Sequence, residues 1–243
     1  MKYLKLFNTE STYLTYRNGS NYVKPNVSLC DDKGKVHYNY SPFNGYGYVD
    51  LGLPSGTLWA TMNVGASKAS DAGLYFQWGD TKGYTAAQVG TGDGKKKFDS
   101  NWSDYKWCDT DKKTFTKYTT KGETLELEDD AAHVNMGGSW HMPSPDQIRE
   151  LIDNTTSEWT SLDGVNGRLF TSKKDGSESI FIPAAGVAWD GSVQSSGDDG
   201  NFWSSMLNTD NVSYGQGLGF GSGDVDLGNG GRFGGLSVRG VVG

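Results

Sequence analysis

The sequence contains few of the residues that build metal centres or disulfide frameworks. Its 243 residues include two cysteines, Cys30 and Cys108, and three histidines, His37, His133 and His141. Two cysteines neither form a disulfide framework nor supply a metal-ligand cluster, so free thiols are the expected state. No histidine stands at a metal-ligand spacing from another His, Cys or Glu. We therefore predict neither a metal site nor a cofactor.

Recognised catalytic motifs are also missing. The chain has no G-x-S-x-G, G-x-G-x-x-G or Walker sequence, although 35 of its residues are glycine. His141 lies between Trp140 and Met142, and we interpret it as a packed structural histidine. Asp198, Asp199 and the later aspartates have no recognised calcium-loop spacing, so we expect them in solvated turns. These absences argue against an enzyme.

Charge and hydropathy exclude two classes of partner. The net charge is −7, so the basic footprint of a nucleic-acid-binding protein is absent. Residues 1–8 lack the apolar core of a secretory signal, and no stretch approaches the length of a transmembrane helix. We predict no nucleic-acid partner and no membrane insertion.

The run from 208 to 235 has the most unusual composition of the chain. Gly, Asn, Asp and Ser fill 18 of its 28 positions, 10 of them Gly, and no Lys or Glu follows Glu178. Glycines occupy the odd-numbered positions from 215 to 223, with Leu218 and Phe220 between them. Because side chains alternate along a strand, this pattern predicts one face in the core and one nearly bare face. Composition alone favours loops and irregular strands. Regular apolar spacing and Trp203, which we expect to be buried beneath the run, argue instead for an ordered surface.

Residues 1–44 are predicted to form an attachment segment. Asn8 or Thr9 is a candidate cap for a helix through Tyr16, and residues 27–30 and 35–38 are predicted to form a small β-hairpin around 31–34. A hairpin of this size needs another surface to pack on.

Residues 45–243 are predicted to form the main domain. Strands are expected at 48–51, 57–62 and 179–183, a short helix at 69–76, and a polar surface insertion at 85–122. Ser144 begins the clearest helix, because Pro145 follows it and Gln147 completes a capping box. This order of elements indicates an α+β fold.

Three motifs in the main domain resemble one family in order and spacing. They are Leu125 to His133, Gly137 to Ser144 (GGSWHMPS) and Asn201 to Ser205 (NFWSS), with an upstream match at 49–60. The family is the C-type-lectin-like domain in its formylglycine-generating-enzyme-like form. The resemblance covers roughly residues 48 to 243 and implies a C-type-lectin-like fold.

The C-terminal run, about 203–239, further resembles the variable region of diversity-generating-retroelement target proteins. In such systems, reverse transcription substitutes bases at template adenines, and AAC codons then yield residues such as Asn, Asp, Ser, Gly, Tyr and Phe, without Lys, Glu or stop codons. The resemblance implies a solvent-facing ligand site on fixed scaffold residues. The candidate ligand-binding set is Asn208, Asp210, Asn211, Ser213, Tyr214, Gly215, Gly217, Gly219, Gly221, Gly223, Asp224, Asp226, Gly228, Asn229, Gly230, Gly231, Phe233 and Gly234. The scaffold set is Leu218, Phe220, Val225, Leu227, Arg232 and Ser237, Val238 and Arg239.

The resemblance implies a receptor-binding component of a phage or prophage tail. Its partners would be a bacterial surface protein or glycan, and other tail subunits through residues 1–44, with a homotrimer as one fitting assembly. It would be made in the cytoplasm, carried on the virion or tail fibre and extracellular after release. Tyr214 and Phe233 are the expected binding anchors. Two alternatives stay open: an enzyme of the formylglycine-generating-like fold, and a structural adhesin subunit. The chain lacks the late reactive cysteines of the formylglycine-generating enzymes. It also lacks the E-P-N and Q-P-D triplets of calcium-dependent lectins.

Overall fold

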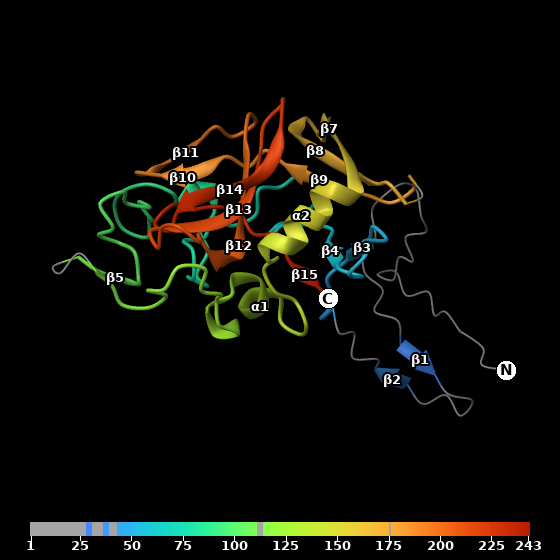
Figure 1. The fold of residues 1–243 in the computed structure, drawn as a ribbon, viewed down its shortest axis with the longest axis horizontal. Coiled ribbons are helices and arrows are strands. Elements are labelled where there is room, and N and C mark those ends of the chain that lie inside the picture. The colour runs from blue at the N-terminus through green and yellow to red at the C-terminus, as the bar shows by residue number, and fades with distance from the viewer. Residues whose placement is uncertain (1–27, 31–35, 39–42, 111–113, 175) are drawn as a thin grey trace.

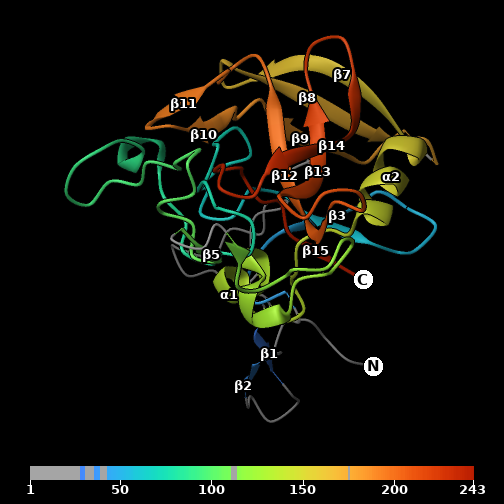
Figure 2. The same ribbon diagram turned by 60° about the vertical axis from the view of Figure 1, so that its left-hand side comes forward.

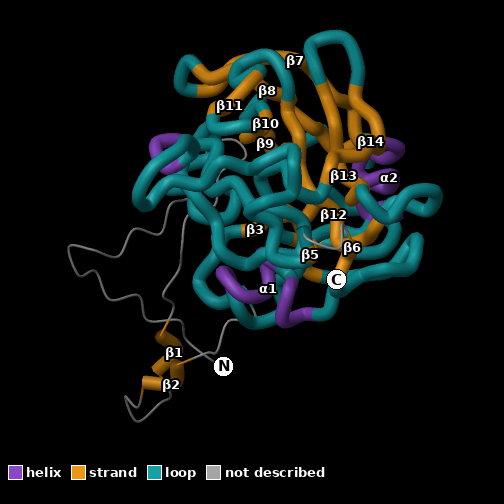
Figure 3. The backbone as a smooth tube through the Cα atoms, turned by 90° about the vertical axis from the view of Figure 1, so that its left-hand side faces the viewer, coloured by secondary structure: helices purple, strands orange, loops and turns teal. Residues whose placement is uncertain are grey.

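A computed structural model describes residues 28–30, 36–38, 43–110, 114–174 and 176–243. Strands β1 (Ser28–Cys30) and β2 (Val36–Tyr38) pair antiparallel, with Leu29 opposite His37, which confirms the predicted hairpin pairing. The helix expected near residues 8–16 lies outside the described residues. The described part of the chain is mostly β-sheet, with two short α-helices, α1 (Ala131–Met136) and α2 (Pro145–Asn154). Figure 3 shows how much of the remaining body is strand and loop.

Helix α2 begins as the sequence predicts. The Ser144 side chain accepts from the Gln147 amide, the Gln147 side chain accepts from the Ser144 amide, and Pro145 occupies the first turn. Ile148 and Leu151 are fully buried on one side of the helix. The reciprocal cap satisfies two backbone amides that the helix cannot bond internally.

Two three-stranded antiparallel sheets lie on either side of the main core. One has the order β12 (Gly200–Leu207), β13 (Tyr214–Phe220) and β14 (Val225–Gly231). The other is β7 (Thr155–Leu162), β8 (Val165–Ser172) and β9 (Ser179–Pro183), of which β9 is buried throughout. Residues of both sheets and of α2 form one buried cluster. Figures 1 and 2 show the turn between β13 and β14 projecting from the upper edge of the body.

The chain ends beside the strands that begin the main domain. Strand β15 (Val241–Val242) pairs with β4 (Leu58–Ala60), which in turn pairs with β3 (Tyr48–Asp50). Figure 1 shows these three strands together near the C-terminus. Residues from the two ends of the domain therefore close its fold by backbone hydrogen bonds.

The remaining elements are short. They are the 3₁₀ turns η1 (Ala86–Gln88) and η2 (Leu127–Asp129), and the two-stranded pairs β5 (Cys108–Asp109) with β6 (Thr114–Phe115) and β10 (Val187–Trp189) with β11 (Ser192–Gln194).

Two local expectations need correction. The helix expected at 69–76 is absent. The backbone amide of Leu74 donates instead to Val64 O, and the amides of Phe76 and Leu236 donate to each other's carbonyl oxygens, so this backbone pairs with other segments. The irregular 85–122 segment is more than a surface insertion. Its Phe98, Tyr105 and Tyr118 are buried in the body.

A second buried cluster is built around tryptophan side chains. Trp78, Trp140 and Trp203 belong to it and are fully buried, and Trp59 is buried in the first cluster. The indole of Trp203 donates to Phe76 O at 2.7 Å, and that of Trp78 donates to Ser204 O at 2.9 Å. The predicted burial of Trp203 is therefore confirmed, and the indole hydrogen bonds fix its position beneath β13 and β14.

Candidate ligand-binding face

One side of the β13–β14 hairpin is fixed in the core. Leu218 lies opposite Leu227 and Phe220 opposite Val225 in the strand register, so these four side chains share a side. Leu218 and Phe220 are 3% and 5% exposed, and all four pack in the cluster that contains Ile148 and Leu151 of α2. The expectation that the four hairpin residues serve as scaffold agrees with this packing.

The other side of the hairpin is bare near the projecting turn. A Cβ placed on Gly219 or Gly228 would meet only a backbone oxygen at 4.0 Å, and one on Gly223 would meet nothing within 4 Å. At Gly221 the nearest atom would be Asp199 Oδ1, at an ordinary contact distance of 3.4 Å. Asp226, opposite Gly219, is exposed. Side chains of many sizes therefore fit at these positions without displacing the core.

The same side is closed at the opposite end of the hairpin. A Cβ on Gly215 would come within 2.5 Å of Trp78 Cδ1, and one on Gly230 within 2.8 Å of the Trp203 ring. At Gly217 the Cβ would lie 2.1 Å from Phe202 O. The prediction that Gly215, Gly217 and Gly230 face solvent is therefore wrong, because the two indoles and strand β12 occupy the space beside them.

The loop before β13 contributes exposed polar residues. Asn208 Oδ1 accepts from the amides of Asp210 and Asn211 at 2.8 Å each, and Asn208 Nδ2 donates to Asn229 Oδ1 at 2.6 Å. Tyr214, the first residue of β13, is 42% exposed. Asn208 thus orders the loop, while Asp210, Asn211, Tyr214 and Asn229 remain accessible.

Phe233 is not the exposed anchor that the composition indicates. It is 6% exposed, and its ring stands edge-to-face between Trp102 at 4.9 Å and Trp189 at 4.7 Å. Its neighbours Gly231 and Gly234 are buried as well. Phe233 therefore supports other aromatic residues, and of the two expected anchors only Tyr214 is exposed.

The two C-terminal arginines have the scaffold position expected of them. Arg232 is fully buried, and Arg239 is 1% exposed and donates to Asn63 Oδ1, Ala60 O and Phe181 O at 2.8–3.1 Å. Burial lowers the pKa of Arg239, and its acceptors are an amide and two carbonyl oxygens. Ser237 and Val238 are also buried. These residues fix the segment between β14 and β15.

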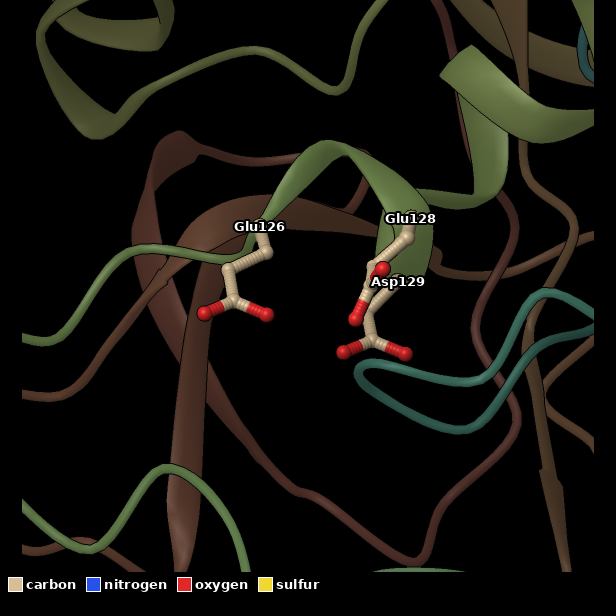
Figure 4. A group of neighbouring side chains, drawn as sticks. All are labelled: Glu126, Glu128 and Asp129. Carbon is tan, nitrogen blue, oxygen red and sulfur yellow. The ribbon is translucent and has the colours of Figure 1, made fainter.

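Glu126, Glu128 and Asp129 form an acidic cluster around η2 (Figure 4). Lys117 Nζ lies 2.7 Å from Asp129 Oδ2 and 3.4 Å from Glu128 Oε1, and it also pairs with Glu126. The hydrogen bonds to Asp129 and to Glu126 raise the pKa of Lys117. Burial opposes ionisation of Asp129, but bonds from Lys117 and Tyr118 outweigh it and lower the pKa of the carboxyl. The Lys117 ammonium group thus contacts all three carboxylates of the cluster.

The described histidines of the main domain bond to the backbone. His133 Nδ1 lies 3.1 Å from Trp140 O, and His141 Nδ1 lies 2.9 Å from Met142 O. Both rings are partly buried. These contacts agree with the structural role expected of His141.

Cys108 is a free thiol whose pKa is raised by burial.

Sequence inspection missed a depression beside Ser213 that is lined by Trp102 and Phe115. Trp102 and Phe115 are two of several aromatic residues in the 85–122 segment, and these residues are the sequence signal for the depression. The segments are distant in sequence, so no spacing rule could join them.

No protein-family model, curated protein or solved structure matched the chain. Among the described helices, none is both long enough and apolar enough to cross a bilayer.

Proposed function

We propose that this chain is a ligand-binding protein with a C-type-lectin-like fold in its formylglycine-generating-enzyme-like form. It displays a hypervariable C-terminal surface diversified by a retroelement, on a tail component of a phage or prophage, and recognises a bacterial surface molecule. Residues 1–44 attach it to other tail subunits, and a homotrimer fits the threefold parts of such particles. The sequence motifs at 125–144 and 201–205 support the fold assignment.

The split between the two sides of the β13–β14 hairpin carries the proposal. On one side Leu218 and Phe220 pack beneath α2, while on the other Gly219 and Gly223 have open space. A protein that varies a surface without losing its fold needs this division, because packed cores do not tolerate changes of volume. Asp226 provides an exposed anionic group on the open side, opposite Gly219. Tyr214 provides an exposed aromatic group at the start of β13, on the side of the strand that carries Leu218 and Phe220.

Recognition by such a surface depends on a few large or charged groups. Tyr214 supplies rigid amphipathic contact area, which binding surfaces use at low entropic cost. The glycine positions leave the present surface shallow. Several copies on one particle would raise a weak single-site affinity through effective concentration.

Whole-cell binding tests this function. The fluorescently labelled full chain, multimerised on beads, is presented to a panel of gut bacterial strains, and binding is scored by flow cytometry. We expect the double variant Tyr214→Ala, Asp226→Ala to lose most of the binding to any recognised strain. The matched control is Val134→Ala, Asp146→Ala, which removes an exposed apolar and an exposed acidic side chain elsewhere. Equal loss in both double variants would argue against the hairpin surface.

A further inference from the structure

The turn between β13 and β14 projects from the body with few side chains to hold it. Its residues are Gly221, Ser222, Gly223 and Asp224, of which the last three are exposed. Within the turn, the Gly221 amide donates to Asp224 O at 3.2 Å. Glycine loses more conformational freedom on folding than any other residue, so a turn with two glycines needs contacts from outside to keep one conformation.

Arg168 of β8 supplies such a contact from the other three-stranded sheet. Its Nε donates to Gly221 O at 3.0 Å, and its Nη1 donates to Ser157 Oγ of β7 at 2.9 Å. Figures 1 and 2 show the projecting turn close to β7 and β8. One guanidinium group therefore joins the turn of the hairpin to two strands of the neighbouring sheet.

Arg168 stands on the core-facing side of β8. It alternates with buried Phe170 along the strand, and it lies opposite Trp159 of β7 and Ile182 of β9. These three side chains pack in the main core cluster, and Arg168 itself is 5% exposed. The rings of Trp159 and Phe170 lie 6.5 and 6.3 Å from the ring of Phe220, the last residue of β13. The core therefore fixes both the strand that carries the donor and the end of β13.

The burial of Arg168 indicates that its hydrogen bonds matter. Its hydrogen-bond partners among the described residues are Ser157 and Gly221, neither of which carries a charged side chain. A buried cation without a carboxylate partner lowers stability, and an apolar side chain of similar volume would pack in the same place without that loss. What the guanidinium group adds at this position is the fixed geometry of its bonds to the sheet and to the turn.

The acceptor in the turn is a backbone oxygen. The bond from Arg168 therefore does not depend on which side chain stands at 221, a position of the candidate ligand-binding set. The opposite end of the hairpin has the same arrangement, because Arg232 Nη1 donates to Val212 O at 3.0 Å and the Arg232 amide donates to Ser213 O at 3.0 Å. Residue types can thus change at 213 and 221 while the bonds that hold the backbone persist.

We propose that Arg168 is a positioning residue for ligand recognition by the hairpin. It holds the turn of residues 221–224 in one conformation, so that the side chains at these positions meet a ligand in a fixed arrangement. A binding surface that is ordered before contact loses less conformational entropy on binding, and its affinity is higher for that reason. The inference rests on the proposed function and adds a residue outside the variable region on which every variant of the surface depends.

Backbone ¹⁵N relaxation of the full chain tests the conformational part of the proposal without a ligand. In Arg168→Met, which keeps an unbranched side chain and removes its donors, the order parameters of residues 222–224 should fall from about 0.85, the value of a rigid backbone, to about 0.6 or below. The matched control is Ser172→Ala, which removes a buried bond from the last residue of the same strand to Leu51 O. The control should leave these order parameters unchanged. Unchanged values in Arg168→Met as well would overturn the proposal.

Arg168→Lys serves as a second variant if Arg168→Met does not fold. It keeps the charge, but a single ammonium group cannot reproduce the planar fork that bonds Ser157 and Gly221 together. The order parameters of residues 222–224 should lie between those of the unchanged chain and those expected for Arg168→Met. Values equal to those of the unchanged chain would overturn the proposal in this variant too.

Whole-cell binding tests the part of the proposal that concerns recognition. On beads, with a strain that the unchanged chain binds, Arg168→Met should bind at least about fivefold less because the turn must be ordered on contact. Ser172→Ala should bind as the unchanged chain does, although both variants lose a buried hydrogen bond. A disordered turn with undiminished cell binding would reject the positioning role and keep the proposed function. A disordered turn together with cell binding that does not need Tyr214 and Asp226 would instead reject the proposed function and leave the hold of Arg168 on the turn.

Discussion

Arg232 Nε donates a hydrogen bond to the hydroxyl of Tyr105 at 2.7 Å, and both side chains are buried. The same guanidinium donates to Tyr118 O at 2.9 Å and to Lys117 O and Val212 O at 3.0 Å. Tyr105, Lys117 and Tyr118 belong to the irregular segment, whereas Val212 precedes β13. One side chain therefore joins the irregular segment to the base of the candidate ligand-binding face.

Replacing Arg232 should destabilise the domain strongly. Arg232→Ala leaves three carbonyl oxygens without this donor, that of Tyr118 in a buried bond and those of Val212 and Lys117 in partly buried bonds. Each loss at a buried acceptor costs about 1–3 kcal/mol. We expect the free energy of unfolding, measured in urea, to fall by at least about 3 kcal/mol. Arg149→Ala removes an exposed pair with Asp146 and should cost less than about 1 kcal/mol. Comparable losses in the two variants would show that the buried network contributes little.

Substitution by alanine should lower the stability of the fold at Gly215 and leave it nearly unchanged at Gly219, although both glycines face the same side of β13. Gly215→Ala forces a Cβ against Trp78, an overpacking that typically costs about 1–3 kcal/mol. Gly219→Ala enters open space and should change the unfolding free energy by no more than about 0.5 kcal/mol. Thermal and urea unfolding of both variants measure this difference. Similar stabilities would contradict the assignment of a closed end and an open end to the hairpin.

The two expected anchors should also separate in a stability measurement. Phe233→Ala removes a ring packed between Trp102 and Trp189, so a loss of about 3–5 kcal/mol is expected. Tyr214→Ala changes an exposed residue and should stay within about 0.5 kcal/mol. Calorimetry of both variants provides the comparison. If the Phe233→Ala protein is as stable as the Tyr214→Ala protein, the packing of Phe233 between Trp102 and Trp189 does not support the fold.

The loop that holds Trp102 should be sensitive to acid. The hydrogen bond from Ser103, followed by that from the Asn101 amide, lowers the pKa of Asp99 to about 2. A carboxyl with a lower pKa in the folded state stabilises the fold above its unfolded value, near 4, and this contribution disappears as the pH falls from about 4 to about 2. Asp99→Asn should therefore lose less stability than the unchanged chain between pH 5 and pH 2. The control is Asp93→Asn, an exposed carboxyl outside this loop, and a pH profile of Asp99→Asn identical to that of the control would refute the prediction.

Local signals in the sequence predicted the elements that depend on them. The capping box of Ser144 and Gln147 fixes the start of α2 through contacts within four residues. The alternation of Leu218 and Phe220 with glycine gave the correct side of β13 for the core. In both cases the controlling interactions are close in sequence or follow the strand period.

Packing between distant segments decided the outcomes that sequence inspection missed. Phe233 is buried because Trp102 and Trp189 approach it from two other parts of the chain. Gly215 lacks open space because Trp78 fills it. Neither contact leaves a pattern in the neighbouring residues, so composition alone could not separate closed positions from open ones.

The central claim is that the open side of the hairpin is varied while the packed side is fixed, and the DNA around the gene tests it most directly. A second, imperfect copy of the segment encoding residues 202–239 and a reverse-transcriptase gene should lie nearby. Differences between the copies should fall at template adenines and change codons on the open side, such as those of Gly219, Gly223 and Asp226. The codons of Leu218 and Phe220 should be identical. Differences spread over all four bases and over core codons, or a complete genome without a second copy, would contradict the account.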